Sequence, residues 1–322
     1  MNSSLSTSDA TTLFSVQYGD SFGSLLLTEC IIGIVGNLIV VFAFARKLVP
    51  LTPFCMLLLN LSVADIFADI VFIPWLFRST YQLIGTQSVV CGLFKFGILT
   101  SLGFRVNVCT VAYISCIRIK SIEKGRSKRI LQKRVVSCYV LGTWIIAVAS
   151  TLPLSFMIKA DPNTGSCEPK YKSFYTLAST FHALFYFIPQ IILVVNFART
   201  IWHIWKTPQF EQSILVKKRK RIGFLLLSLT TAYIVCFIPI LVWQMMRSLG
   251  NLPKRDLLTL HRIGGVMGYL TTISDPVLYA LCWSGFRQGF VRCSERTAHR
   301  SAALDSTNQE RGISVATAVS EL

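Results

Sequence analysis

The chain has 322 residues, of which 52% are hydrophobic and 15% are charged, and its formal net charge is +17. The apolar residues come in long blocks rather than in the alternation of a soluble domain, which is typical of a membrane protein. A charge this positive can indicate a nucleic-acid-binding protein, but here the basic residues cluster at the ends of the apolar blocks. We interpret them as topology signals and contacts to anionic lipid, so no nucleic-acid partner is predicted.

Seven apolar blocks are long enough to cross a bilayer, which takes about 20 residues per helix. They cover residues 25–45, 54–77, 93–117, 135–158, 174–198, 222–246 and 263–283. The loops after the first, third and fifth blocks carry 17 Lys and Arg, and the loops on the opposite side carry nine. Because positively charged loops stay in the cytoplasm, we predict an extracellular N-terminus and a cytoplasmic C-terminus. The predicted fold is an all-α membrane protein, a bundle of seven transmembrane helices at residues 25–283.

The two ends of the chain are polar. Residues 1–24 form a predicted extracellular segment with a glycosylation acceptor at Asn2. Residues 284–322 are predicted to begin with a short amphipathic eighth helix around Phe286-Arg287 and to continue as a Ser- and Thr-rich cytoplasmic tail that cannot bury a core.

Each apolar block carries a recognisable group of residues. In chain order they are Gly36-Asn37, Leu61-Ser62-Val63-Ala64-Asp65 with Pro74, Ser115-Cys116-Ile117-Arg118-Ile119, Trp144 with Pro153, Pro189, Tyr233-Ile234-Val235-Cys236-Phe237-Ile238-Pro239, and Asp275-Pro276-Val277-Leu278-Tyr279. With these groups in this order, residues 25 to about 293 resemble the rhodopsin-like (class A) G-protein-coupled receptors. The resemblance implies a plasma-membrane receptor that binds an extracellular ligand and activates a heterotrimeric G protein.

Other activities are disfavoured by specific residues. The seventh block lacks a lysine for a retinal Schiff base, and Tyr269 stands at that position, so no retinal is expected. Thr100 stands where monoamine receptors have an aspartate. The four scattered histidines provide neither a metal cluster nor a paired nucleophile and base, so we predict no enzyme. A transporter would show repeated halves, and none is found.

Asp65 lies in the middle of an apolar block, where an unpaired carboxylate is costly, so it is expected to face the bundle interior. In the resemblance it corresponds to the sodium-site aspartate, with Asn107 as a second ligand and Asp275 in place of the commoner asparagine. Hard oxygen donors from three helices suit a small hard cation. The alternative is a water-filled network in which Asp65 and Asp275 share one proton.

Arg118 and Tyr279 are the residues that the resemblance assigns to G-protein coupling. An acid normally precedes this arginine and restrains it, but Ile117 occupies that position here. Two interpretations follow: a receptor with a weakened inactive state, or a degenerate motif in a receptor that couples poorly or acts as a decoy.

Arg105 lies thirteen residues before Arg118, about 20 Å deeper in the bilayer at 1.5 Å per residue. If Asn107 faces Asp65, Arg105 lies about 200° round the helix and faces the fourth and fifth blocks, which contain no Asp or Glu. It therefore either awaits an anionic group of the ligand or is satisfied by carbonyls, waters or Asp69.

The resemblance places further residues at the outer, ligand-facing end of the bundle. They are Trp75, Thr100, His182, Phe237, Gln244 and Tyr269. Isolated aromatic residues such as Trp75 and Tyr269 can equally be packing residues. The short polar N-terminus, the missing amine anchor and the basic outer residues favour a short peptide or another ligand with an anionic group.

Further features come from the resemblance and from short motifs. Cys91 and Cys167 match the disulfide that ties the third helix to the second extracellular loop, although Cys91 lies two residues further from Arg118 than the family spacing predicts. Cys293 is a predicted palmitoylation site beside the eighth helix. The Ser- and Thr-rich tail makes arrestin a candidate partner, and Ser320-Glu321-Leu322 resembles a PDZ-domain ligand.

Overall fold

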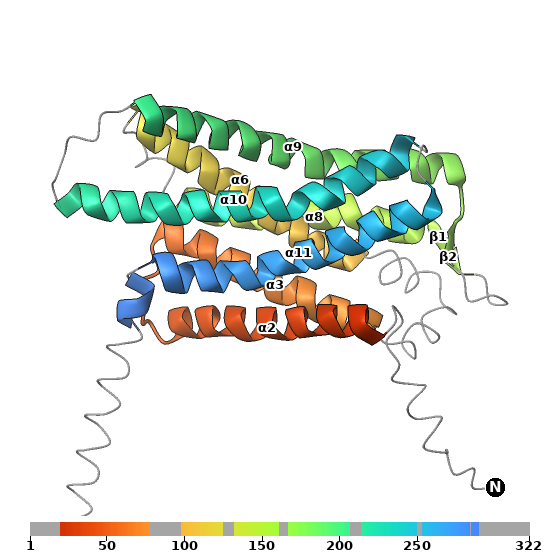
Figure 1. Cartoon of the computed structure of the whole chain (residues 1–322), viewed down its shortest axis with the longest axis horizontal. Coiled ribbons are helices and arrows are strands. Elements are labelled where there is room, and N and C mark those ends of the chain that lie inside the picture. The colour runs from red at the N-terminus through yellow and green to blue at the C-terminus, as the bar shows by residue number, and fades with distance from the viewer. Residues whose placement is uncertain are drawn as a thin grey trace, which may run out of the picture.

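A bundle of long helices forms the protein (Figure 1). The computed structural model of the chain describes residues 20–76, 98–124, 132–160, 167–206, 214–249, 253–283 and 285–289. Within these residues, seven long helices lie side by side along one direction. They are α2 (Asp20–Ala45), α3 (Pro53–Leu76), α6 (Ile98–Lys124), α8 (Lys133–Phe156), α9 (Lys172–Lys206), α10 (Ile214–Leu249) and α11 (Lys254–Cys282). The predicted seven-helix all-α bundle is confirmed.

The apolar composition explains why these segments are helical. In hydrocarbon each backbone N–H and C=O must be satisfied within its own segment, which a helix achieves. Within the described part of the chain, α2, α3, α6, α8 and α10 each contain a stretch long and apolar enough to cross a membrane. The helices α9 and α11 contain 35 and 29 residues.

Several helices extend beyond the apolar blocks that predicted them. The helix α10 begins at Ile214 rather than near 222, α6 ends at Lys124 rather than 117, and α11 begins at Lys254 rather than 263. Hydropathy measures only the part of a helix that meets hydrocarbon. Lys and Arg are good helix formers, so basic segments continue the same helices into the aqueous layer.

Short elements cap the two ends of the bundle. Strand β1 (Ile158–Ala160) pairs antiparallel with β2 (Cys167–Pro169), at the end of the bundle where α2 and α11 begin (Figure 1). Such three-residue strands leave no periodic signal in the sequence. At the opposite end, residues 285–289 are helical directly after α11, where the eighth helix was predicted.

The interior combines an apolar cluster with a polar column. The cluster includes Leu57 and Leu61 of α3, Ile114 of α6 and Leu225 and Leu229 of α10. The polar column consists of fully buried side chains from four helices, namely Asn37, Asp65, Asp69, Asn107 and Asp275. Large apolar side chains such as those of α2 and α8 lie exposed on the outside, as expected for a surface that meets lipid.

Candidate functional site

The centre of the bundle holds the predicted sodium-site residues. Asn107 Nδ2 donates a hydrogen bond of 2.5 Å to Asp65 Oδ1, and both side chains are fully buried. The contact depends on a close approach of α6 to α3, because a Cβ added at Gly103 would lie 2.8 Å from the Ala64 carbonyl oxygen. The glycine one turn above Asn107 thus brings the amide within reach of the carboxylate.

Asp275 completes this central site from α11. The Tyr233 hydroxyl of α10 donates to Asp275 Oδ2 at 3.3 Å, and the Tyr279 hydroxyl lies next to the same carboxylate. Asp275 and Asp65 are both fully buried side chains of this site. Tyr233 was part of the sixth-block motif, but its contact with Asp275 was not predicted.

The donor set fits a small hard cation. Asp65 Oδ2, Asn107 Oδ1 and Asp275 Oδ1 are buried oxygens that accept no hydrogen bond from the protein. Oxygens of this kind from α3, α6 and α11 can bind a cation or share a proton. Among the residues that the structure describes, His, Cys, Asp and Glu form no group of three that could hold a metal ion. The unpaired oxygens brought together here belong to two carboxylates and one amide.

A hydrogen-bonded triad braces the helices around the site. Trp144 Nε1 of α8 donates to Asn60 Oδ1 of α3 at 2.9 Å, and Asn60 Nδ2 donates to Thr110 Oγ1 of α6 at 2.9 Å. One amide, five residues before Asp65 on α3, thus joins three helices.

An aromatic cluster lies on the outer side of the central site. The Phe104 ring packs edge-on against Phe237 and Tyr269, with centroids 5.9 and 5.2 Å away, and Tyr269 stacks on Phe72 at 4.3 Å. Thr100 lies one turn outward of Phe104 and is 9% exposed. We call Phe72, Phe104, Phe237 and Tyr269 the aromatic junction, since it connects α3, α6, α10 and α11.

The remaining predicted ligand residues are on three helices. Trp75 belongs to α3, His182 to α9 and Gln244 to α10, and their side chains lie outside the described residues. Of the predicted ligand residues whose side chains are described, Phe237 and Tyr269 both contact Phe104, and Thr100 lies one turn from Phe104 on α6.

Arg105 is buried on the opposite side of α6 from the central site. It is 1% exposed, and its guanidinium donates to Ser150 Oγ of α8. Its orientation toward the fourth helix matches the predicted 200° rotation from Asn107. Asp69 lies beside Gly33 of α2 and Thr272 of α11. Asp69 thus has neighbours on α2 and α11, whereas Arg105 donates to α8.

The C-terminal end of α6 is held by neutral contacts. Ile117 is buried in the apolar cluster, and among the described residues no acidic side chain pairs with Arg118. Asn196 of α9 instead donates to Ser115 Oγ at 3.0 Å and to Cys116 Sγ at 3.1 Å. An amide from a neighbouring helix thus contacts the two residues directly before Ile117, the position where the family has an acid.

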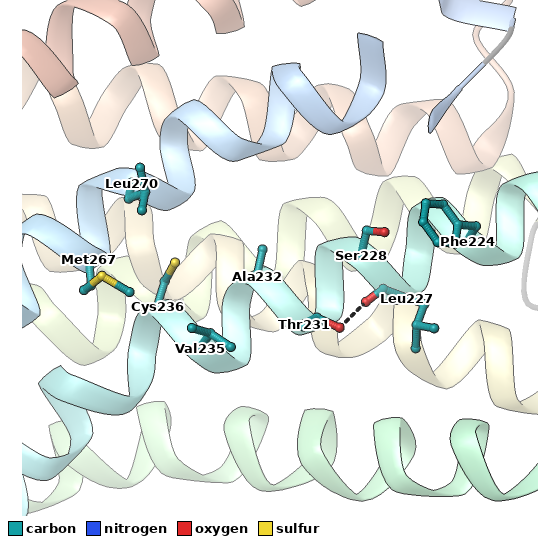
Figure 2. Close-up of a pocket in the computed structure, with 9 residues that line it drawn as sticks. All are labelled: Phe224, Leu227, Ser228, Thr231, Ala232, Val235, Cys236, Met267 and Leu270. Atoms are coloured by element: carbon teal, nitrogen blue, oxygen red, sulfur yellow. Dashed lines mark hydrogen bonds between the residues drawn. The ribbon is translucent and has the colours of Figure 1, made fainter. Parts of the chain in front are cut away.

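A groove of about 500 Å³ runs along the outer surface between α10 and α11 (Figure 2). Its lining is Phe224, Leu227, Ser228, Thr231, Ala232, Val235, Cys236, Met267 and Leu270. The Thr231 hydroxyl donates to the Leu227 carbonyl at 2.8 Å, so its proton is used within α10. Most of the other side chains that line the groove are apolar. Phe224 and Val235 are exposed, as expected for a lipid-facing surface. None of the predicted site residues lines this groove.

The structure does not test the four predicted modification and disulfide residues. Asn2, Cys91 and Cys293 lie outside the described residues, as does the side chain of Cys167 in β2. The disulfide, the palmitoylation and the glycosylation stay predictions.

Two acids that sequence reasoning did not assign to the central site are also buried in the bundle. Asp69 is fully buried and Glu29 is 7% exposed. Their signal was present in the sequence, because an acid within an apolar span must find a partner. Asp69 also lies four residues after Asp65 and hence on the same face of α3.

Comparisons with known proteins agree with this architecture. The family described as 7 transmembrane receptor (rhodopsin family) matches residues 36–279. Galanin receptor 2b of Danio rerio is 26% identical over 81% of this chain and 71% of its own length. Neuropeptide receptor 15 of Caenorhabditis elegans is 25% identical over 85% and 90%, and somatostatin receptor type 5 of Rattus norvegicus is 22% identical over 84% and 77%. The chain therefore belongs to the rhodopsin family of seven-transmembrane receptors.

Proposed function

We propose that this receptor binds a short peptide, or another ligand with an anionic group, among the outer halves of its helices and activates a heterotrimeric G protein. The observation that carries the proposal is the similarity, over more than four fifths of the chain, to receptors named for galanin, neuropeptides and somatostatin. In this proposal the N-terminus is extracellular and the C-terminus cytoplasmic, and the receptor acts at the plasma membrane. The Ser- and Thr-rich tail binds arrestin, and Ser320-Glu321-Leu322 binds a PDZ domain.

A continuous set of contacts connects the outer end of the bundle to its centre. Phe237 belongs to the aromatic junction, and Tyr233, one turn inward on α10, stacks on its ring at 5.6 Å. The Tyr233 hydroxyl in turn bonds to Asp275. A ligand that favours a different packing of Phe237 therefore shifts the position of α10 relative to α11. Such a ligand changes the balance between a closed and an open bundle through its differential affinity for the two.

In this mechanism a sodium ion at Asp65, Asn107 and Asp275 stabilises the closed bundle. A monovalent cation offsets the repulsion between the two buried carboxylates, which supports its preference for the state that brings them together. A proton shared by Asp65 and Asp275 would offset the same repulsion. A thermal stability that rises with sodium and loses part of that rise in Asp65→Asn supports the ion. A rise that is the same in the parent and in Asp65→Asn supports the shared proton.

Arg105 is the proposed partner for the anionic group of the ligand. Arginine can bind a carboxylate through two parallel N–H donors, and Arg105 is a buried cation whose guanidinium donates to Ser150 Oγ. Truncating one partner of a buried, hydrogen-bonded charge pair costs about 2 to 5 kcal/mol. Arg105→Gln should therefore weaken an anionic agonist by tens-fold or more.

The experiment that tests the proposal is a screen of a peptide library in cells that express the receptor, with G-protein activation as the readout. An active peptide is then assayed with its C-terminal carboxylate free or amidated, on the parent receptor and on Arg105→Gln. Ser150→Ala is the matched control, because it removes the neighbouring hydroxyl and keeps the cation. Equal potency on the parent and Arg105→Gln, with reduced surface expression of the latter, would assign Arg105 a structural role instead.

A second candidate function rests on Ile117. The missing acid leaves Arg118 without an ionic partner among the described residues, which favours a receptor with a high basal activity over one that is silent until a ligand binds. A decoy that never activates a G protein is the competing outcome.

A further inference from the structure

A second group of buried oxygens lies on the extracellular side of the central site. It consists of Glu29 and Gly33 of α2, Asp69 of α3 and Thr272 of α11, and we call it the outer acid cradle. Asp69 follows Asp65 by four residues, so the two carboxylates lie on one face of α3 with their backbones about 6 Å apart along the helix. The cradle is thus one turn away from the central site and shares no residue with it.

The acids of the cradle lack strong hydrogen-bond donors. Asp69 Oδ1 and Oδ2 and Glu29 Oε2 are buried and accept no hydrogen bond from the protein. The Thr272 hydroxyl lies close to Asp69, but its proton is donated to the Tyr269 carbonyl at 2.8 Å. While the hydroxyl makes that bond, the Thr272 oxygen can offer lone pairs to a cation in the cradle. The remaining neighbour, the Cys30 thiol, is only a weak donor.

Gly33 provides the space in which these oxygens converge. A Cβ added at Gly33 would lie 2.4 Å from Asp69 Oδ2 and 2.4 Å from Thr272 Oγ1. Oxygens from two different helices thus approach one bare stretch of the α2 backbone. Any side chain larger than hydrogen at this position would displace them.

The charge around the cradle calls for compensation. Asp65, Asp69 and Asp275 are fully buried, and Glu29 is 7% exposed, so four acids lie within the bundle interior. Arg105, the buried cation at similar depth, donates to Ser150 on α8. Among the described residues, no Lys or Arg is a charged neighbour of the Asp69 or Glu29 carboxyl group. Buried ionisable groups within a membrane are costly unless they are paired.

We propose that the outer acid cradle is a second binding position for a small monovalent cation, with the Asp69 carboxylate as its charged ligand and the Thr272 hydroxyl as a neutral ligand. Glu29, one turn further out on α2, attracts the cation from the extracellular side. Hard oxygen donors select a hard ion, and a single carboxylate at the centre balances a single charge. A calcium ion takes six to eight oxygen ligands, more than the cradle provides. The proposal does not depend on the identity of the receptor's ligand.

The test is the thermal stability of the purified full-length receptor in sodium chloride and in N-methyl-D-glucamine chloride at equal ionic strength. We expect sodium to raise the Tm of the parent receptor and of Asp65→Asn, because Asp65→Asn retains the cradle. Asp69→Asn should also retain part of the rise, and the double variant should lose it. Complete loss of the rise in Asp65→Asn would overturn the proposal, and so would a rise that persists in the double variant. A rise with magnesium or calcium chloride in place of sodium would overturn the choice of cation.

A second pair of variants serves if Asp69→Asn does not fold. Thr272→Ala removes the neutral ligand, and Ser274→Ala is its matched control, because that hydroxyl on the same helix donates to the Thr271 carbonyl. In the Asp65→Asn background, Thr272→Ala should abolish the remaining sodium effect and Ser274→Ala should not. Equal sodium responses of the two variants would refute the role of Thr272. These readouts use no peptide and no G protein, so failure of the peptide proposal leaves them unaffected.

Discussion

Replacing Ile117 with aspartate should lower basal signalling. The substitution restores an acid beside Arg118, which has no acidic partner among the described residues. A hydrogen bond between charged groups contributes about 1.5 to 3 kcal/mol. If the bond forms only in the closed bundle, the fraction of receptor in the open state should decrease by a factor of between about 10 and about 100, since each 1.4 kcal/mol is a factor of ten.

The same substitution also removes packing, and this effect must be separated from the charge. Ile117 is 5% exposed and belongs to the apolar cluster with Leu225 and Leu229 of α10. Ile117→Asn is the matched control, because it loses the same apolar contacts without adding a negative charge. Both variants should express less well than the parent, so basal activity must be normalised to receptor at the cell surface.

The assay is second-messenger accumulation without ligand, measured for each G-protein class. The reasoning predicts that Ile117→Asp has lower basal activity per surface receptor than both the parent and Ile117→Asn. Basal activity of Ile117→Asp equal to or above that of Ile117→Asn would refute it.

Three further experiments test individual contacts. Tyr233→Phe removes the hydroxyl that bonds to the α11 carboxylate at 3.3 Å, so its Tm should fall and its basal activity should rise; an unchanged basal activity would exclude this bond as a restraint. Gly103→Ala forces α6 away from the α3 carbonyl and should lower the Tm, whereas Gly142→Ala, with open space around it, should leave the Tm equal or higher. A double-mutant cycle of Asn60→Ala and Trp144→Phe should give a coupling of about 0.6 kcal/mol, the average for interhelical hydrogen bonds in membranes, and additive effects would exclude the contact.

Sequence reasoning was most effective where one residue type has few physical options. Seven long apolar blocks predicted seven helices, because hydrocarbon leaves the backbone no other partner than itself. The rotation of 100° per residue predicted that Arg105 and Asn107 face different helices, and the structure shows them bonded to α8 and α3 respectively. The helix ends were less accessible, since a basic helix continues into water without a hydropathy signal, as at Ile214.

Contacts between distant segments could not be derived from the sequence. The Tyr233 hydroxyl meets Asp275 only because of the rotation of α10 against α11, which depends on the packing of many side chains. The choice of Ser150 as the partner of Arg105 likewise depends on the depth at which α8 crosses α6. The outer acid cradle requires three helices to meet at Gly33, and a glycine within a helix has many explanations until its neighbours are known.

The central claim, that this receptor activates a G protein, is tested most directly with purified components. The receptor in lipid nanodiscs is mixed with each class of heterotrimeric G protein, and nucleotide exchange is followed with and without an active peptide. We expect the parent receptor to accelerate exchange on at least one class above empty nanodiscs, the peptide to increase the rate, and Arg118→Ala to remove the acceleration. Nucleotide exchange at the rate of empty nanodiscs for every G-protein class, with the peptide bound, would contradict the claim. The chain would then be a decoy receptor that binds its ligand without activating a G protein.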